Sequence, residues 1–271
     1  MQLDRRYLLP VDLLAAQNRL LVACARRSDF QLPGVDRSQL DRITEWQREY
    51  TRPAWWSPSL SEARGAGYGL GGILSTQPVD PEAVVRRYVV GLSTGRQERL
   101  DEVLWGRPRD AIAVYGIDAT PLVSRTRGCW AESQGLLYGH PRRWARLSNT
   151  ALNVAVRQRD EMLRAPGFAS AREAWARCVA PVSPGARLPI DVRFRAEDAR
   201  SRVRVPSRLA VEVRIASRDA RCSDMSRLRE IGPGASEWAA RRIVRRYEPI
   251  LSEYDKAVAA ARVKARGLGV L

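Results

Sequence analysis

The sequence predicts a mainly α-helical globular protein with long Pro/Gly-rich loops and at most a small β-hairpin. Apolar side chains recur every three to four residues along several segments, as on one face of a helix. Proline and glycine gather in two irregular tracts, 51–80 and 179–206. The 271 residues are 45% hydrophobic and 28% charged, which suits a folded chain with a sizeable core. We expect a single helical domain over residues 1–271.

The N-terminal part predicts two helices followed by a loop. Residues 10–27 form the first helix, and its apolar face consists of Leu13, Leu14, Leu20, Leu21 and Cys24. A second, charge-rich helix is expected over residues 36–50. The tract 51–80 combines prolines and glycines with aromatic residues, which indicates a flexible loop.

Residues 80–139 predict three more helices and one extended segment. Asp80 caps a helix that has Pro81 at its first position. A further helix ends at Gly106, and "RGCWAESQGLLYG" returns to helical spacing. Between them, "AIAVYGIDATPLV" is apolar and β-branched, which indicates a short strand or an extended segment.

The C-terminal half predicts amphipathic helices separated by the second irregular tract. A helix over residues 148–167 ends at Pro166 and Gly167, and Ser170 with Glu173 forms a capping box that opens the next one. Residues 179–206 are expected to be partly extended, either as a hairpin or, as Pro206 favours, as a loop. A long helix over residues 235–266 contains Pro249, which should kink or split it.

The stretch "SRLAVEVRIASRDARCSDM", residues 207–225, admits two interpretations. As a strand, it would place Glu212 among aliphatic residues, like one half of a nuclease metal site. As a helix, it aligns an apolar stripe of Leu209, Val213, Ala216 and Ala220. The stripe is longer than the alternation, so we predict a helix with Glu212 off its apolar face.

The net charge of +16 favours an anionic partner, since 46 basic residues, 44 of them arginines, face 30 acidic ones. Nucleic acid, phospholipid headgroups and anionic wall polymers are the classes that such a charge attracts. A solvated surface without a dedicated ligand is the alternative. The candidate anion-binding residues are Arg241, Arg242, Arg245, Arg246, Arg142 and Arg143.

Three aromatic residues, Trp55, Trp56 and Tyr68, lie in the first irregular tract. In a binding loop they would stack on sugars or bases. The alternative is that they close the edge of the core, which is the commoner fate of tryptophan.

No motif assigns an enzymatic activity. Asp191 and Glu212 as metal ligands lack a partner lysine, because Arg214 stands at that place and cannot act as a base. The only histidine, His140, lies in a Gly–His–Pro turn, which is typical of an exposed or capping residue. "GAGYGLGG" has neither the lysine of a P-loop nor a strand–turn–helix context. We therefore assign no catalytic residue, no metal ligand and no cofactor.

The compartment is left open by the composition. No run of about 18 apolar residues predicts a transmembrane segment, and the N-terminus has no signal peptide. The chain is then either cytosolic or a mature form without its leader. Four isolated cysteines outside any C-x-x-C pair predict two disulfides, with four buried thiols as the alternative.

Several segments resemble a family of actinobacterial secreted proteins, often lipoproteins. They are, in chain order, "NRLLVACARRSDFQLP", "RYVVGLSTGRQERLDEVLWG", "GCWAESQGLLYG", "AWARCVAP", "LAVEVRIASRDARCSDMSRL" and the last helix. The resemblance implies an exported, helical, disulfide-stapled protein, and it implies no activity. Among the three possible connectivities we favour Cys24–Cys178 and Cys129–Cys222, because Cys24 and Cys178 each lie in a predicted helix that is followed by a proline. The residues after Cys178 and the missing lipid-bearing cysteine depart from the family pattern, which leaves membrane anchoring open.

These observations favour a non-enzymatic secreted or cell-envelope protein with a basic surface. Its partner would be an anionic wall polymer, lipid headgroups or another protein. One alternative is a cytoplasmic nucleic-acid-binding protein of phage or plasmid type that uses the arginine-rich helix. A second alternative is a hydrolase or nuclease.

Overall fold

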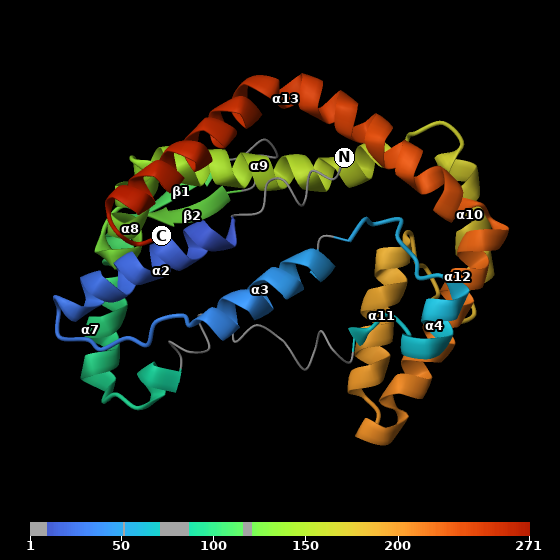
Figure 1. The fold of residues 1–271 in the computed structure, drawn as a ribbon, viewed down its shortest axis with the longest axis horizontal. Helices are drawn as coiled ribbons and strands as arrows, with labels where there is room; N and C mark the ends of the chain where they lie inside the picture. The colour runs from blue at the N-terminus through green and yellow to red at the C-terminus, as the bar shows by residue number, and fades with distance from the viewer. Residues whose placement is uncertain (1–9, 51, 71–86, 116–120) are drawn as a thin grey trace. The chain divides into compact units, whose positions relative to one another are not determined.

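The computed structural model describes residues 10–50, 52–70, 87–115 and 121–271 (Figure 1). These residues are mainly α-helical with one two-stranded antiparallel sheet, which confirms the predicted fold class. They group into two compact units, each built from segments far apart in the sequence. The α12 unit comprises residues 48–50, 52–70 and 156–245; the β-hairpin unit comprises residues 10–47, 87–115, 121–155 and 246–271. The single domain over residues 1–271 stays a prediction.

The elements divide between the units as follows. The β-hairpin unit holds α2 (Val11–Arg26), most of α3 (Arg37–Tyr50), α7 (Thr94–Trp105), the 3-10 turn η1 (Pro108–Asp110), β1 (Ala111–Tyr115), β2 (Pro121–Arg125) and α8 (Gly128–Tyr138). The α12 unit holds α4 (Leu60–Ala66), α10 (Phe168–Val179), α11 (Pro189–Ser201), the 3-10 turn η2 (Val205–Ser207) and α12 (Arg208–Met225). Two long helices, α9 (Pro141–Met162) and α13 (Leu228–Gly267), contribute to both.

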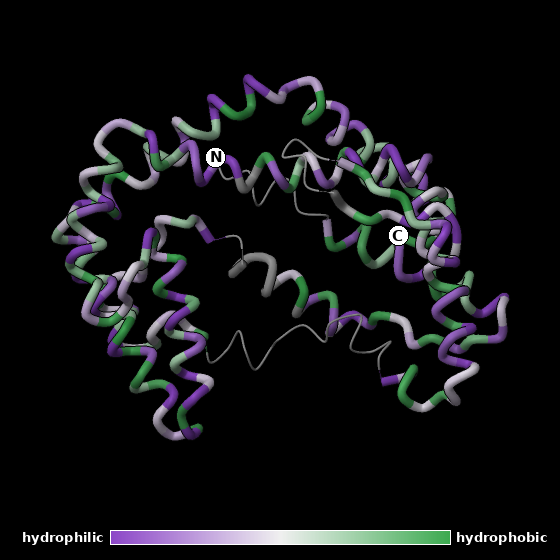
Figure 2. The backbone as a smooth tube through the Cα atoms, turned by 180° about the vertical axis from the view of Figure 1, so that it is seen from behind, coloured by the Kyte–Doolittle hydropathy of each residue, from purple (hydrophilic) through white to green (hydrophobic). Residues whose placement is uncertain are grey.

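The helices predicted near the N-terminus and before the sheet are confirmed. α2 buries Leu13, Leu21 and Cys24 from its predicted face. Asp36 caps α3, because its Oδ1 accepts the main-chain N–H of Gln39 at 2.8 Å. Hydrophobic and hydrophilic residues alternate along the helices (Figure 2), as expected of helices that bury one face.

The tract predicted as a loop over residues 51–80 contains the helix α4. Ser59 and Glu62 form a capping box, in which each side chain accepts the other residue's main-chain N–H. The glycines and prolines around α4 conceal this short helical stretch in the sequence. Residues 51 and 71–80, with the predicted Asp80 cap and Pro81, lie outside the described residues.

The expected hairpin within residues 179–206 is wrong, because α11 occupies its centre. Pro189 stands at the first helical position, and Asp191 accepts the main-chain N–H groups of Arg187 and Leu188 at 2.7 and 2.9 Å. Val192 and Ala196, one turn apart, are fully buried. Capping and helical burial therefore override the proline-rich composition that suggested an extended segment.

Three expected helix boundaries also differ from the structure. α10 begins at Phe168 after the left-handed Gly167, so Ser170 and Glu173 lie inside the helix and form no capping box. Phe168 is fully buried, which explains the earlier start. α9 begins at Pro141, seven residues before the expected start, and α13 continues through Pro249 without being split.

The small sheet lies in the segment where a strand was expected. β1 pairs with β2 so that Ala113 lies opposite Val123 and Val114 lies opposite Leu122. Val114 and Ser124 are buried, whereas Ala113, Tyr115 and Val123 on the other face are exposed. The hairpin therefore packs against its unit through one face only.

Each unit has its own hydrophobic core and its own disulfide. In the β-hairpin unit, Cys24–Cys129 links α2 to α8; in the α12 unit, Cys178–Cys222 links α10 to α12. Two disulfides are thus formed, as predicted, but the expected pairing is wrong. Each cysteine bonds within its own unit, because Cα atoms must approach to about 6 Å and those of both pairs are 5.5 Å apart.

No helix in the described part of the chain combines the length and apolarity that a membrane crossing requires.

Candidate functional site

α12 carries two buried carboxylates, Glu212 and Asp219, whose exposed fractions are 1% and 0%. They are seven residues apart, so they lie two helical turns apart on the same face. The helix predicted over residues 207–225 is confirmed, but the placement of Glu212 off the buried face is wrong. Because burial of a carboxylate is costly without hydrogen bonds, the partners of both groups define the candidate site.

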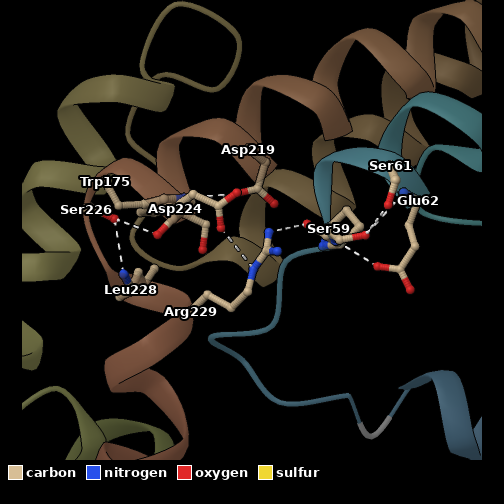
Figure 3. A network of polar contacts seen from close by, with 11 residues as sticks. Ser59, Ser61, Glu62, Trp175, Asp219, Asp224, Ser226, Leu228 and Arg229 are labelled. Atoms are coloured by element: carbon tan, nitrogen blue, oxygen red, sulfur yellow. Dashed lines mark hydrogen bonds and ion pairs between the residues drawn. The ribbon is translucent and has the colours of Figure 1, made fainter.

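Asp219 accepts hydrogen bonds from two aromatic side chains, and Figure 3 shows one of them, Trp175, beside the carboxylate. The Tyr68 hydroxyl donates to Oδ2 at 2.7 Å, and the Trp175 indole Nε1–H donates to Oδ1 at 2.8 Å. Burial raises the pKa of Asp219 to about 6, although these hydrogen bonds act in the opposite direction. Burial, with the nearby Asp219 charge, also raises the pKa of the Tyr68 hydroxyl well above its usual value.

Glu212 accepts hydrogen bonds from main-chain amides and lies beside one arginine. Its Oε1 accepts the N–H groups of Tyr68 and Leu70 at 2.9 and 2.8 Å, and Arg200 lies 3.4 Å from Oε2. Gly67, with φ +65°, is needed beside this carboxylate, because a Cβ atom there would lie 2.6 Å from the Glu212 Cγ. Glu212 therefore fixes the chain immediately after α4.

Arg229, near the start of α13, fastens the chain immediately before α4 (Figure 3). Its Nη2–H donates to the Pro58 carbonyl, and its Nε lies 3.3 Å from the Asp224 Oδ1. Residues 57–70, hereafter the anchored segment, are thus held at one end by Arg229 and at the other by Glu212. This arrangement engages the buried carboxylates in structural contacts.

The aromatic residues predicted as a binding loop belong mostly to the edge of this core. Tyr68 is buried, and its hydroxyl is used by Asp219. Trp55 lies so close to α13 that a Cβ atom on Gly232 would be 2.6 Å from its ring. Trp56 is half-buried and lies 6.5 Å from Tyr68 between ring centroids. Only Trp55 and Trp56 keep partial exposure.

Three of the six predicted anion-binding arginines pair with an acidic residue, and all six are exposed. Arg241 pairs with Glu237, Arg242 with Glu161, and Arg143 with Glu253. The other three are Arg142, Arg245 and Arg246. Arg241, Arg242 and Arg245 belong to the α12 unit, and the other three belong to the β-hairpin unit. The pairs of Arg241 and Arg143 are exposed on both sides and therefore weak, so an anion can compete for these two arginines. Glu161, the partner of Arg242, is only 13% exposed.

His140 and Asp191 both lie at helix starts. The exposed His140 precedes α9, and its carbonyl accepts the main-chain N–H of Trp144 at 3.0 Å. Asp191 caps α11, as described above. Within the described ranges, no group of three or more His, Cys, Asp or Glu side chains is placed to hold a metal ion.

The sequence interpretation missed Asp219, Arg200 and Trp175 as members of the α12 cluster. The seven-residue spacing between Glu212 and Asp219 was a usable signal, because it places both on one helix face. Arg200 and Trp175 come from α11 and α10, and no local pattern connects them to α12.

The chain matches no protein-family model, no curated protein and no solved structure. Its function is therefore inferred from its own residues and their contacts.

Proposed function

We propose that the chain is a non-enzymatic protein of the cell exterior or cell envelope that binds an anionic partner through its arginine-rich surface. The observation that carries this proposal is the use of all four cysteines in two disulfides, one in each compact unit. Structural disulfides persist in oxidising compartments and are rare in the cytosol.

The two disulfides close long stretches of chain, which supports a structural role for both. Cys24 and Cys129 are 105 residues apart, and Cys178 and Cys222 are 44 apart. Loop-closure entropy then predicts about 5 and about 4 kcal/mol of stabilisation, respectively. Contributions of this size are comparable with the whole stability of a typical domain, so folding would depend on the redox state.

The charge supports an anionic partner. With a net charge of +16, the protein attracts polyanions and anionic surfaces over the range of the Debye length. Arg142, Arg245 and Arg246 are exposed, and the Arg241 and Arg242 side chains, each paired with a glutamate, are exposed as well. The buried Glu212 and Asp219 are assigned to holding the anchored segment and not to a reaction, since their oxygens accept from main-chain and aromatic donors.

The test is fractionation of the native host followed by mass spectrometry of the alkylated, unreduced protein. The proposal expects the protein outside the cytoplasm with no alkylated cysteine. Four free thiols in protein purified from the native host would contradict it.

A binding assay separates this proposal from the nucleic-acid alternative. Binding to DNA and to a wall-type polyanion is compared while the salt concentration rises, because each phosphate contact weakens with salt. Strong DNA binding by a cytoplasmic protein with free thiols would favour the nucleic-acid alternative.

A further inference from the structure

The turn between α11 and α12 forms an exposed end of the α12 unit. Residues 202–209, hereafter the α11–α12 tip, have the sequence RVRVPSRL, and all of them except the half-buried Val203 and Arg208 are exposed. Figure 1 shows the two helices side by side with this turn at their lower end. The other end of α12 is tied to α10 through Cys222. The tip therefore projects from a fixed helical pair.

Apolar side chains lie at the centre of the α11–α12 tip. The exposed fraction of Val205 is 70%, and that of Leu209, one turn further along the chain, is 52%. Pro206 between them is exposed as well. Figure 2 shows the end of the α11–α12 pair that carries this turn as a mixture of strongly hydrophobic and strongly hydrophilic residues. Neighbouring exposed apolar residues with a polar rim are typical of an interaction surface.

Arginines surround these apolar residues without an acidic residue among them. Four arginines and no Asp or Glu occur between Asp198 and Glu212. Arg200 pairs with Glu212 inside the unit, and Arg202 pairs with Asp198 at 2.8 Å. Arg204 is exposed, and Arg208 is half-buried with its Nε–H donated to the Val203 carbonyl. The tip thus presents positive charge directly beside apolar surface.

We propose that the α11–α12 tip binds the surface of an anionic phospholipid bilayer. Val205 and Leu209 enter the boundary between headgroups and acyl chains, while Arg204 and Arg208 contact lipid phosphates. The inference rests on the proposed function and names the class of its partner. A nucleic acid would satisfy the arginines but leave Val205 and Leu209 in water, whereas a bilayer accommodates both.

The expected contributions follow from the two kinds of contact. Each arginine near an anionic bilayer strengthens binding roughly fivefold at physiological salt. Burial of an exposed valine or leucine side chain strengthens it by about tenfold or more. The arginine contribution falls as salt rises, and the apolar contribution does not. Binding by the tip should therefore show a salt-sensitive and a salt-resistant part.

The test is sedimentation of the full chain, with its disulfides intact, with vesicles of phosphatidylcholine alone or mixed with phosphatidylglycerol. The wild type should bind the mixed vesicles much more strongly than the neutral ones, on which only the salt-resistant apolar contribution acts. Arg204→Ser should weaken binding roughly fivefold, and Val205→Ser should weaken it about tenfold. At high salt the residual binding of the wild type should be lost in Val205→Ser.

Matched controls lie at the other end of α12. Arg221 and Met225 are exposed there, so Arg221→Ser and Met225→Ser remove the same kinds of group away from the tip. Both should bind like the wild type. Equal melting temperatures would show that all four variants are folded.

Two results would overturn the inference: a wild type that does not sediment with mixed vesicles, or a Val205→Ser variant that binds as tightly as the wild type. The second result would indicate a purely ionic contact of the kind made with nucleic acid. If the protein is extracellular and has both disulfides but does not bind vesicles, the inference about the α11–α12 tip is rejected and the proposed function is kept. Free thiols in the native host would reject the proposed function itself.

Discussion

Glu212 and Asp219 of α12 share one donor residue, Tyr68, whose main-chain N–H donates to Glu212 and whose hydroxyl donates to Asp219. One residue of the anchored segment thus donates hydrogen bonds to two buried carboxylates that lie two turns apart on the same face of α12. Loss of either hydrogen bond leaves a buried carboxylate oxygen of Glu212 or Asp219 without the donor that Tyr68 supplies, which costs free energy. The stability of the α12 unit should therefore respond strongly to small changes at Tyr68.

Tyr68→Phe should lower the free energy of unfolding by about 1–3 kcal/mol, because the Asp219 Oδ2 loses the hydroxyl donor while the ring is kept. Urea unfolding followed by circular dichroism measures the change. The control is Tyr115→Phe, which removes a hydroxyl from an exposed residue of β1 and should leave stability unchanged. Equal effects of the two substitutions would contradict the assigned role of Tyr68.

The stability contributed by Asp219 should fall as the pH rises. Its pKa is raised from 3.8 to about 6 on folding, so between these values the folded protein keeps a proton that the unfolded chain has released. The contribution is complete below about pH 4 and is lost as the pH passes about 6. A shift of two pKa units corresponds to about 3 kcal/mol, taken as an upper value.

Asp219→Asn isolates this titration from that of the other carboxyl groups. The unfolding free energy of the wild type minus that of the variant should decrease between about pH 4 and about pH 7. Urea unfolding at several pH values gives this difference directly. A difference that stays constant over the whole range would show that Asp219 does not titrate there.

Two glycines that flank Pro233 in α13 should respond in opposite ways to alanine. Gly234→Ala should raise the free energy of unfolding by about 0.5–1 kcal/mol, since nothing lies within 4 Å of its new Cβ and alanine favours the helix. Gly232→Ala should lower it by about 1–3 kcal/mol, because the new Cβ would meet the Trp55 ring at 2.6 Å. Thermal unfolding of both variants tests the packing of Trp55; a stabilising Gly232→Ala would reject it.

Peptide mapping without reduction should recover a peptide that joins Cys24 to Cys129 and another that joins Cys178 to Cys222. Replacement of the first pair by serines should cost about 5 kcal/mol, and replacement of the second should cost about 4 kcal/mol. Urea unfolding of the two double variants shows which disulfide contributes more to the free energy of unfolding. A peptide that joins Cys24 to Cys178 would contradict both disulfides and support the pairing expected from the sequence.

Local patterns identified some features of the fold and misplaced others. The apolar stripe over residues 207–225 correctly indicated a helix, because backbone hydrogen bonds within a helix are local. It misplaced Glu212, because Leu209 is exposed and the buried face of α12 is set by α4, α10 and α11. The helix α11 was missed because its proline-rich flanks resemble those of a loop, although Pro189 and Asp191 are also start signals.

The sequence by itself determined the helical class, most helix positions, an extended segment where the small sheet lies and the presence of two disulfides. These features depend on spacing, capping residues and cysteine count, which act over a few residues or on composition alone. Only the tertiary structure decided which cysteines pair, and that Tyr68 connects Glu212 and Asp219. Both results join residues 44 to 151 positions apart. Contacts at such separations depend on how helices pack, and no short-range pattern encodes them.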